Sequence, residues 1–257
     1  MNDSHSTPPL IPANLRSAGL PSPPPGASPD EQAPIPNFVA AVEAILREPR
    51  RVMFQLRQPG SGGLIAAMLT VSVVCGLIYG LITGTFSAGT QLWAAPVKIA
   101  GGLLISALIC LPSLYIFSCL SGSQARLIEV VGLVAGLLLL MTVLLIGFAP
   151  VAWVFSQSTE SVAAMGALHL AFWFISTCFG LRFLSAAFVH YGHSGDGLKV
   201  WMGIFLLVML QMTTALRPIV GTADTFLPKE KKFFVTHWID CLKGGQPATA
   251  EKFGAPK

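Results

Sequence analysis

The chain has 257 residues, of which 53% are hydrophobic and only 11% charged, whereas an average soluble domain carries about 25% charged residues. So few charges cannot cover the surface of a water-soluble protein of this length, and the composition therefore predicts a membrane protein. The net charge of +4 is small, and the basic residues lack the aromatic and groove-reading patterns of nucleic-acid-binding proteins. The lipid bilayer is an expected partner, and nucleic acid is not.

Residues 1–36 hold ten of the 19 prolines, mixed with serine, alanine and glycine. Because proline fixes φ and lacks a backbone donor, this composition predicts a disordered, proline-rich tail. Such a tail is either a plain solvated segment or a preformed polyproline ligand for a protein partner. Both interpretations stay open on the sequence.

The pattern changes at Asn37, a typical helix N-cap, and Pro49 divides the amphipathic segment 37–60 into two short helices. A basic and apolar segment of this kind is expected to lie on the membrane surface. Arginines should face anionic headgroups while apolar side chains enter the interface. The basic residues are Arg47, Arg50, Arg51 and Arg57, and the apolar ones are Val52, Met53, Phe54 and Leu56.

Five apolar windows contain no Asp, Glu, Lys or Arg. About 20 apolar residues are needed for a helix to cross the hydrocarbon core, so these windows predict an all-α, polytopic helix bundle with five transmembrane helices. The predicted spans are residues 63–86, 99–120, 130–155, 162–181 and 200–216, within a transmembrane domain of residues 61–218.

Positive charge indicates the orientation of the spans. Four arginines precede the first span, Arg126 lies in the second connection and Lys199 in the fourth, whereas the third connection has no Lys or Arg. The positive-inside bias therefore predicts a cytoplasmic N-terminus. Residues 219–257 form a basic and aromatic tail typical of a headgroup layer. Its charges favour the cytoplasm, although five spans would put it on the other side.

Small residues form a stripe in the first predicted span, and a shorter one in the third. Residues four apart lie on one helix face, and small side chains there let another backbone approach closely. The stripe predicts either packing within the bundle or a homo- or hetero-oligomeric contact. Its members are Ser72, Gly76, Gly80 and Gly84, with Gly132 and Gly136 in the third span.

Two charges lie deepest in the predicted bundle. Glu129 begins the third span and Arg182 follows the fourth, so an antiparallel hairpin would bring them to similar depths. Because intramembrane charges are costly, the two are expected to form an intramembrane pair. Alternatively, Arg182 snorkels to the surface and Glu129 pairs with Arg126, three residues earlier.

No residue pattern predicts a catalytic or cofactor site, so we do not expect an enzyme. His169 is a lone histidine among apolar residues, which is typical of a hydrogen-bonded packing residue. His190 and His193 have the spacing of metal ligands, with Asp196 nearby, but three such groups at that spacing are a weak metal signal. The five cysteines are scattered singly. We therefore predict no metal and no cofactor.

The segment 115–135, YIFSCLSGSQARLIEVVGLVA, joins the end of one span, a Gly/Ser turn and the start of the next. With the five spans and the proline-rich N-terminal tail, it resembles the Yip-domain family, five-span membrane proteins associated with Rab-type GTPases and vesicle traffic, which have many bacterial relatives. The ending 211–221, QMTTALRPIVG, is similar to the final span of bacterial inner-membrane proteins.

These likenesses imply a bacterial inner-membrane location, or alternatively a eukaryotic endomembrane. The proline-rich tail, the basic amphipathic segment and the lack of catalytic groups predict a non-enzymatic scaffold or adaptor whose cytosolic N-terminal region recruits a protein partner. The competing hypothesis is a transporter or channel subunit, because Gln211, Thr213 and Thr214 are polar residues within a span.

Overall fold

The computed structural model describes residues 24–86, 89, 91–120, 122–123, 125–159, 162–190 and 196–216. These residues are all-α, and no strand occurs among them. Three short helices come first: α1 (Pro29–Gln32), α2 (Phe38–Arg47) and α3 (Pro49–Arg57). Five long helices follow: α4 (Gly62–Thr85), α5 (Gln91–Leu120), α6 (Leu127–Ser158), α7 (Val162–His190) and α8 (Asp196–Ala215).

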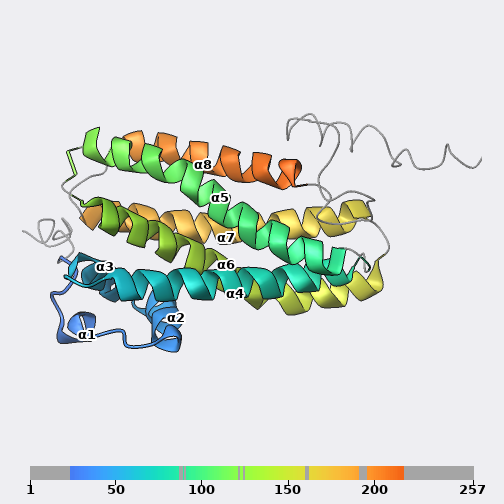
Figure 1. Ribbon diagram of the computed structural model, residues 1–257, viewed down its shortest axis with the longest axis horizontal. Helices are drawn as coiled ribbons and strands as arrows, with labels where there is room; N and C mark the ends of the chain where they lie inside the picture. Colours follow the sequence, from blue (N-terminus) through green and yellow to red (C-terminus); the bar gives the residue numbers. More distant parts are fainter. Residues whose placement is uncertain are drawn as a thin grey trace, which may run out of the picture.

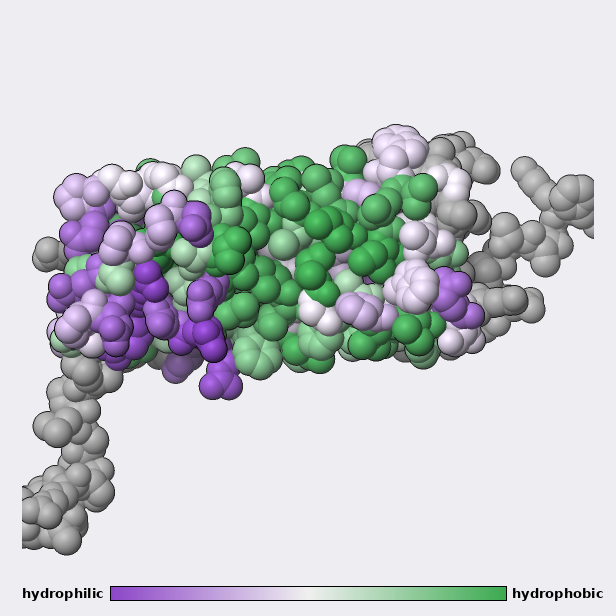
Figure 2. Space-filling model, turned by 90° about the horizontal axis from the view of Figure 1, so that it is seen from below, coloured by the Kyte–Doolittle hydropathy of each residue, from purple (hydrophilic) through white to green (hydrophobic). Residues whose placement is uncertain are grey.

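The long helices lie side by side, and successive ones run in opposite directions (Figure 1). Helix α4 packs against α5 and α6, α7 packs against α6, and α8 packs against α5. The short helices α1 to α3 gather at the end of the bundle where α4 begins, and we call them the cap. Figure 2 shows hydrophobic side chains in a band across the middle of one face and hydrophilic side chains concentrated at the cap end.

Among the described residues, four helices are long and apolar enough to cross a membrane: α4, α5, α6 and α7. Their length and composition are those of an integral membrane protein. Helix α8 has a shorter apolar stretch, Gly197–Thr213. Leu216, the last described residue, directly follows α8 and lies over Gly102, which is eleven residues, or about 16 Å, from the start of α5. The described part of α8 thus stops short of that end of α5, and the C-terminal tail predicted for 219–257 lies outside the described residues.

Helix α6 occupies the centre of the bundle, and 72% of its apolar window is buried by other parts of the chain. A helix that is apolar on every side is stable only when it is surrounded by protein or lipid, and here protein surrounds it. Leu133, Leu137, Met141 and Leu145 are fully buried along its length.

The predicted stripes of small residues are used within this chain. A Cβ atom on Gly80 would lie 2.8 Å from the backbone nitrogen of Pro96, so α4 and α5 touch backbone to backbone. Gly76 faces Ala100 one turn away. Ser72 and Gly84 are also buried. The second stripe packs against the cap and α7. Leu56 of α3 lies over Gly132, and Ile45 of α2 and Phe183 of α7 lie over Gly136.

Candidate functional site

The cap is packed into the protein more deeply than its amphipathic pattern predicts. Val52, Met53 and Leu56 of α3 are at most 1% exposed and belong to the main hydrophobic core. The prediction that they enter the lipid interface is therefore corrected: they pack inside the protein, and Leu56 lies over Gly132 of α6. Phe54 is half-buried and packs over Gly26.

Helix α2, instead, carries an exposed apolar surface. Ala41, Ala44 and Ile45 face the bundle, whereas Phe38, Val39 and Leu46 are 54%, 76% and 47% exposed. At about 100° per residue, the exposed apolar sector lies between the buried sector and the polar sector of Glu43 and Arg47. A helix with these three faces fits the boundary between protein, lipid and water.

Residues 24–36, predicted to belong to a disordered tail, are held in place by two arginines. Arg50 Nε donates to Glu31 Oε1 at 2.7 Å. Arg51 donates to the carbonyl oxygens of Ala33 and Pro34 at 2.9 and 2.8 Å. This ordering corrects the sequence prediction for residues 24–36, and residues 1–23 lie outside the described residues.

Arg50 and Arg51 thus bind the chain itself rather than serving only as contacts to headgroups. Arg47 is exposed and pairs with Glu43 at 2.9 Å, so its guanidinium remains at the surface. Arg57 accepts, through its carbonyl oxygen, a hydrogen bond of 3.1 Å from Arg126. The carbonyl end of α3 is favourable for a cation, so Arg126 ties the cap to the start of α6.

The same Arg126 also forms the ion pair of Glu129. Its Nε lies 2.7 Å from Glu129 Oε1, while Arg182 is exposed and no ion pair joins it to Glu129 within the described part of the chain. The geometry therefore selects the local i,i+3 alternative over the predicted Glu129–Arg182 pair. The physical reason is that Arg126 reaches the carboxylate within one helical turn, whereas Arg182 is exposed to the surroundings of the bundle.

Glu31 is the acidic centre of the cap. Burial raises the pKa of its carboxyl, but the Gly26 N–H, which donates to Oε2 at 2.6 Å, and the Arg50 guanidinium together hold the pKa below its ordinary value of 4.5. A carboxylate whose pKa is lower in the folded state than in the unfolded state stabilises the folded cap at pH values above its unfolded-state pKa. That contribution is lost as pH falls through the lowered value.

We expect Glu31→Gln to loosen residues 24–36 at neutral pH, because a neutral amide replaces the charged acceptor of Arg50 and Gly26. Amide hydrogen exchange of this segment in the full chain should quicken severalfold, and the wild type should show the same change only when the pH is taken below about 4.5. Glu43→Gln is the matched control, since the Glu43–Arg47 pair is exposed on both sides. Equal exchange in both variants would contradict the role given to Glu31.

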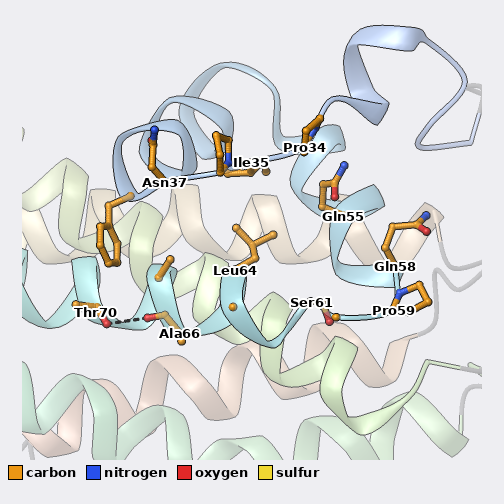
Figure 3. Close-up of a pocket in the computed structure, with 15 residues that line it drawn as sticks. Pro34, Ile35, Asn37, Gln55, Gln58, Pro59, Ser61, Leu64, Ala66 and Thr70 are labelled. Carbon is orange, nitrogen blue, oxygen red and sulfur yellow. Dashed lines mark hydrogen bonds between the residues drawn. The ribbon is translucent and has the colours of Figure 1, made fainter.

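A groove of about 580 Å³ opens between the cap and the first turns of α4 (Figure 3). The segment Pro34–Phe38 forms one wall, and Gly63, Leu64, Ala66, Ala67 and Thr70 of α4 form the floor. Gln55, Gln58 and Ser61 lie toward one end of the groove, and Ala66 and Thr70 lie toward the other. None of its lining residues is charged.

A second polar feature lies inside the bundle, away from the cap. The Tyr79 hydroxyl and His169 Nδ1 are 2.7 Å apart, and both side chains are buried. His169 Nε2 has no hydrogen-bond partner among the described residues. The sequence predicted a hydrogen-bonded histidine here but not its partner. Their similar depth in the bundle could have suggested the pairing, because Tyr79 lies six residues before the end of α4 and His169 seven residues after the start of α7.

The weak metal pattern lies largely outside the described side chains, which exclude those of His190, His193 and Asp196. Within the described part of the chain, no group of three His, Cys, Asp or Glu side chains is arranged to hold a metal ion. A scan against family models, a search of curated proteins and a search of solved structures gave no match to this chain.

Proposed function

We propose that this chain is a non-enzymatic, Yip-like membrane scaffold that recruits a soluble protein partner through its cytosolic N-terminal region. In this proposal α8 is the fifth span, the N-terminus is cytoplasmic and the membrane is a bacterial inner membrane, with a eukaryotic endomembrane as the alternative. The bilayer and a partner at the N-terminal region are the expected partners, with a homo- or hetero-oligomer as an additional possibility.

The cap carries this proposal. It is a polar, folded platform at one end of an apolar bundle, and arginine contacts hold it there. Its arginines bind backbone carbonyls of residues 24–36, so the polypeptide N-terminal to Pro24 starts from a fixed point on the bundle. A tethered proline-rich segment loses less entropy on binding than a free one, which favours recruitment.

Several buried hydroxyls of the bundle also support a scaffold, whereas those of Ser106, Ser118 and Ser176 have no hydrogen-bond partner among the described residues. Four buried hydroxyls donate to backbone carbonyls four residues earlier on their own helices, so they offer no donor to a passing solute. These are Ser72, Thr83, Thr142 and Thr177. Thr213, one of the polar residues that suggested transport, likewise donates to the carbonyl of Leu210.

Photo-cross-linking from the cap tests recruitment. A photoreactive residue in place of Glu48, which is exposed, should capture the same soluble protein from native membranes in the wild-type background and in the Glu43→Gln background. The Glu31→Gln background should capture several times less, because the cap is looser. The scaffold proposal fails if cross-links are confined to lipid, or if capture is unchanged by Glu31→Gln.

If the chain has five spans, the two ends of the described bundle and the segment after α8 should be labelled from defined sides of the membrane. In a background with the native cysteines replaced, Asp30→Cys should react with a membrane-impermeant thiol reagent only from the cytoplasmic side. Gln157→Cys, exposed in the last turn of α6, should react only from the other side. Lys229→Cys should react together with Gln157→Cys if α8 crosses, since a fifth span reverses the side. Labelling of Lys229→Cys from the cytoplasm would instead leave four spans.

A transporter or channel subunit remains the second candidate, and the buried Tyr79–His169 pair is the observation that favours it. Polar groups inside a membrane protein commonly mark proton or solute pathways. Purified protein in liposomes would then show a flux of protons that Tyr79→Phe reduces at least tenfold. The absence of a proton flux in these liposomes, or a flux that Tyr79→Phe leaves unchanged, would argue for the scaffold.

A further inference from the structure

The groove beside the cap changes in chemistry along its length. Gln58 and Ser61 supply amide and hydroxyl groups toward one end, where the Gln55 amide already donates to the carbonyl oxygens of Gln32 and Ala33, and the methyl group of Ala66 lies toward the other. The hydroxyl of Thr70 is already bonded to the carbonyl of Ala66 at 2.8 Å, so that end presents no free donor. An occupant that matches both ends has a polar and an apolar part.

With α4 crossing the membrane, we expect the groove to cross the level at which a bilayer changes from polar to apolar. Its floor runs along the first turns of α4, and Thr70 lies eight residues, or about 12 Å, from the start of that helix. A headgroup layer is about 5–8 Å thick on each side of the hydrocarbon core, so this floor extends from the headgroup layer into the acyl region. Phe38, which lines the groove and is 54% exposed, belongs to the apolar sector of α2 that fits the same boundary.

We propose that this groove binds one membrane phospholipid, with the glycerol and ester groups beside Gln58 and Ser61 and an acyl chain over Ala66 and Ala67. The volume of about 580 Å³ lies within the range of sites for small molecules. Because no lining residue is charged, the site selects the glycerol-ester region and not the headgroup charge. The proposal goes beyond partner recruitment and requires only that α4 crosses the membrane.

Gly63 and Gly62 provide a matched pair of variants. Both begin α4, both are exposed, and a Cβ atom on either would meet nothing within 4 Å, but only Gly63 lines the groove. Gly63→Leu therefore adds a side chain at the lining of the groove without a clash at Cβ, and Gly62→Leu adds the same side chain outside it. Both variants should melt within 2 °C or so of the wild type in detergent, because the added Cβ atom meets no other atom at either position.

Native mass spectrometry of the full chain, incubated with equal amounts of phosphatidylethanolamine and phosphatidylglycerol, measures occupancy. The wild type and Gly62→Leu should retain one phospholipid of either class, and Gly63→Leu should retain at least tenfold less. Equal retention by Gly63→Leu would overturn the proposal, as would retention of phosphatidylglycerol alone. Loss of protein capture by Gly63→Leu at unchanged lipid occupancy would assign the groove to the protein partner and also overturn it.

A second measurement needs no variant. A phospholipid with a photoreactive acyl chain, placed in vesicles with the wild-type protein, should label residues 66–70 several times more than the lipid-exposed residues Phe174 and Phe179 of α7. A bound lipid stays near one place longer than the surrounding bilayer lipids do. Equal labelling of the two segments would show that the groove holds no lipid of its own.

Discussion

Replacing Trp201 by alanine is expected to destabilise the bundle by about 3–5 kcal/mol, the range for truncating a fully buried tryptophan. Trp201 is 1% exposed and stacks on Phe205 with ring centroids 5.2 Å apart. Its Nε1–H also donates to the carbonyl oxygen of Cys110 at 3.0 Å and to Ser113 Oγ at 3.1 Å. These contacts join α8 to α5, so their loss should release α8 before the remaining helices separate.

Thermal unfolding in detergent measures the first effect, and proteolysis near α8 measures the second. Trp153→Ala is the control, because Trp153 is 52% exposed and is expected to face lipid. Trp201→Phe should recover most of the packing without the hydrogen bonds. If Trp201→Ala and Trp153→Ala melted alike, the indole would not be what holds α8 in place.

Gly80→Leu should cost at least the roughly 1–3 kcal/mol typical of an overpacked core, because the obstacle is backbone. A Cβ atom there would overlap the Cα and nitrogen of Pro96, and neither can rotate away as a side chain can. The two helices would have to separate along their contact. Gly136→Leu should cost less, since there the nearest obstacle is the ring of Phe183.

Gly147→Leu is the matched control for this comparison. Gly147 lies within α6 and is exposed, and a Cβ atom added to it would meet nothing within 4 Å, so leucine should be neutral or slightly stabilising. Thermal unfolding of the three variants in one detergent gives the order. A Gly80→Leu protein as stable as Gly147→Leu would mean that α4 and α5 do not meet at Pro96.

The membrane helices could be predicted from the sequence because the bilayer imposes a strict rule on them. A charge-free apolar window of sufficient length must form a helix if it crosses the hydrocarbon core, since backbone polar groups have no other partner there. Helix ends were harder to predict. Helix α5 begins at Gln91, seven residues before Lys98, a buried residue at which the apolar window stops.

The cap could be predicted only in part, because an amphipathic pattern does not say what covers its apolar face. Lipid and protein both accept Val52, Met53 and Leu56, and only the tertiary structure, in which Leu56 lies over Gly132, shows that protein covers them. The same limit applies to Glu129. Its pairing with Arg126 needs one turn of helix, whereas pairing with Arg182 needs a tertiary geometry that spacing alone cannot supply.

The central position of α6 has a consequence for hydrophobic mismatch. With 32 residues, α6 is about 48 Å long, well above the roughly 30 Å of the hydrocarbon core, and α4 with 24 residues is about 36 Å long. Because protein surrounds most of α6, the lipids contact chiefly α4, α5 and α7, and the lengths of these helices determine the hydrophobic mismatch. Bilayer thickness should therefore act on the tilt of these outer helices, while the long central helix keeps its register whichever membrane surrounds the protein.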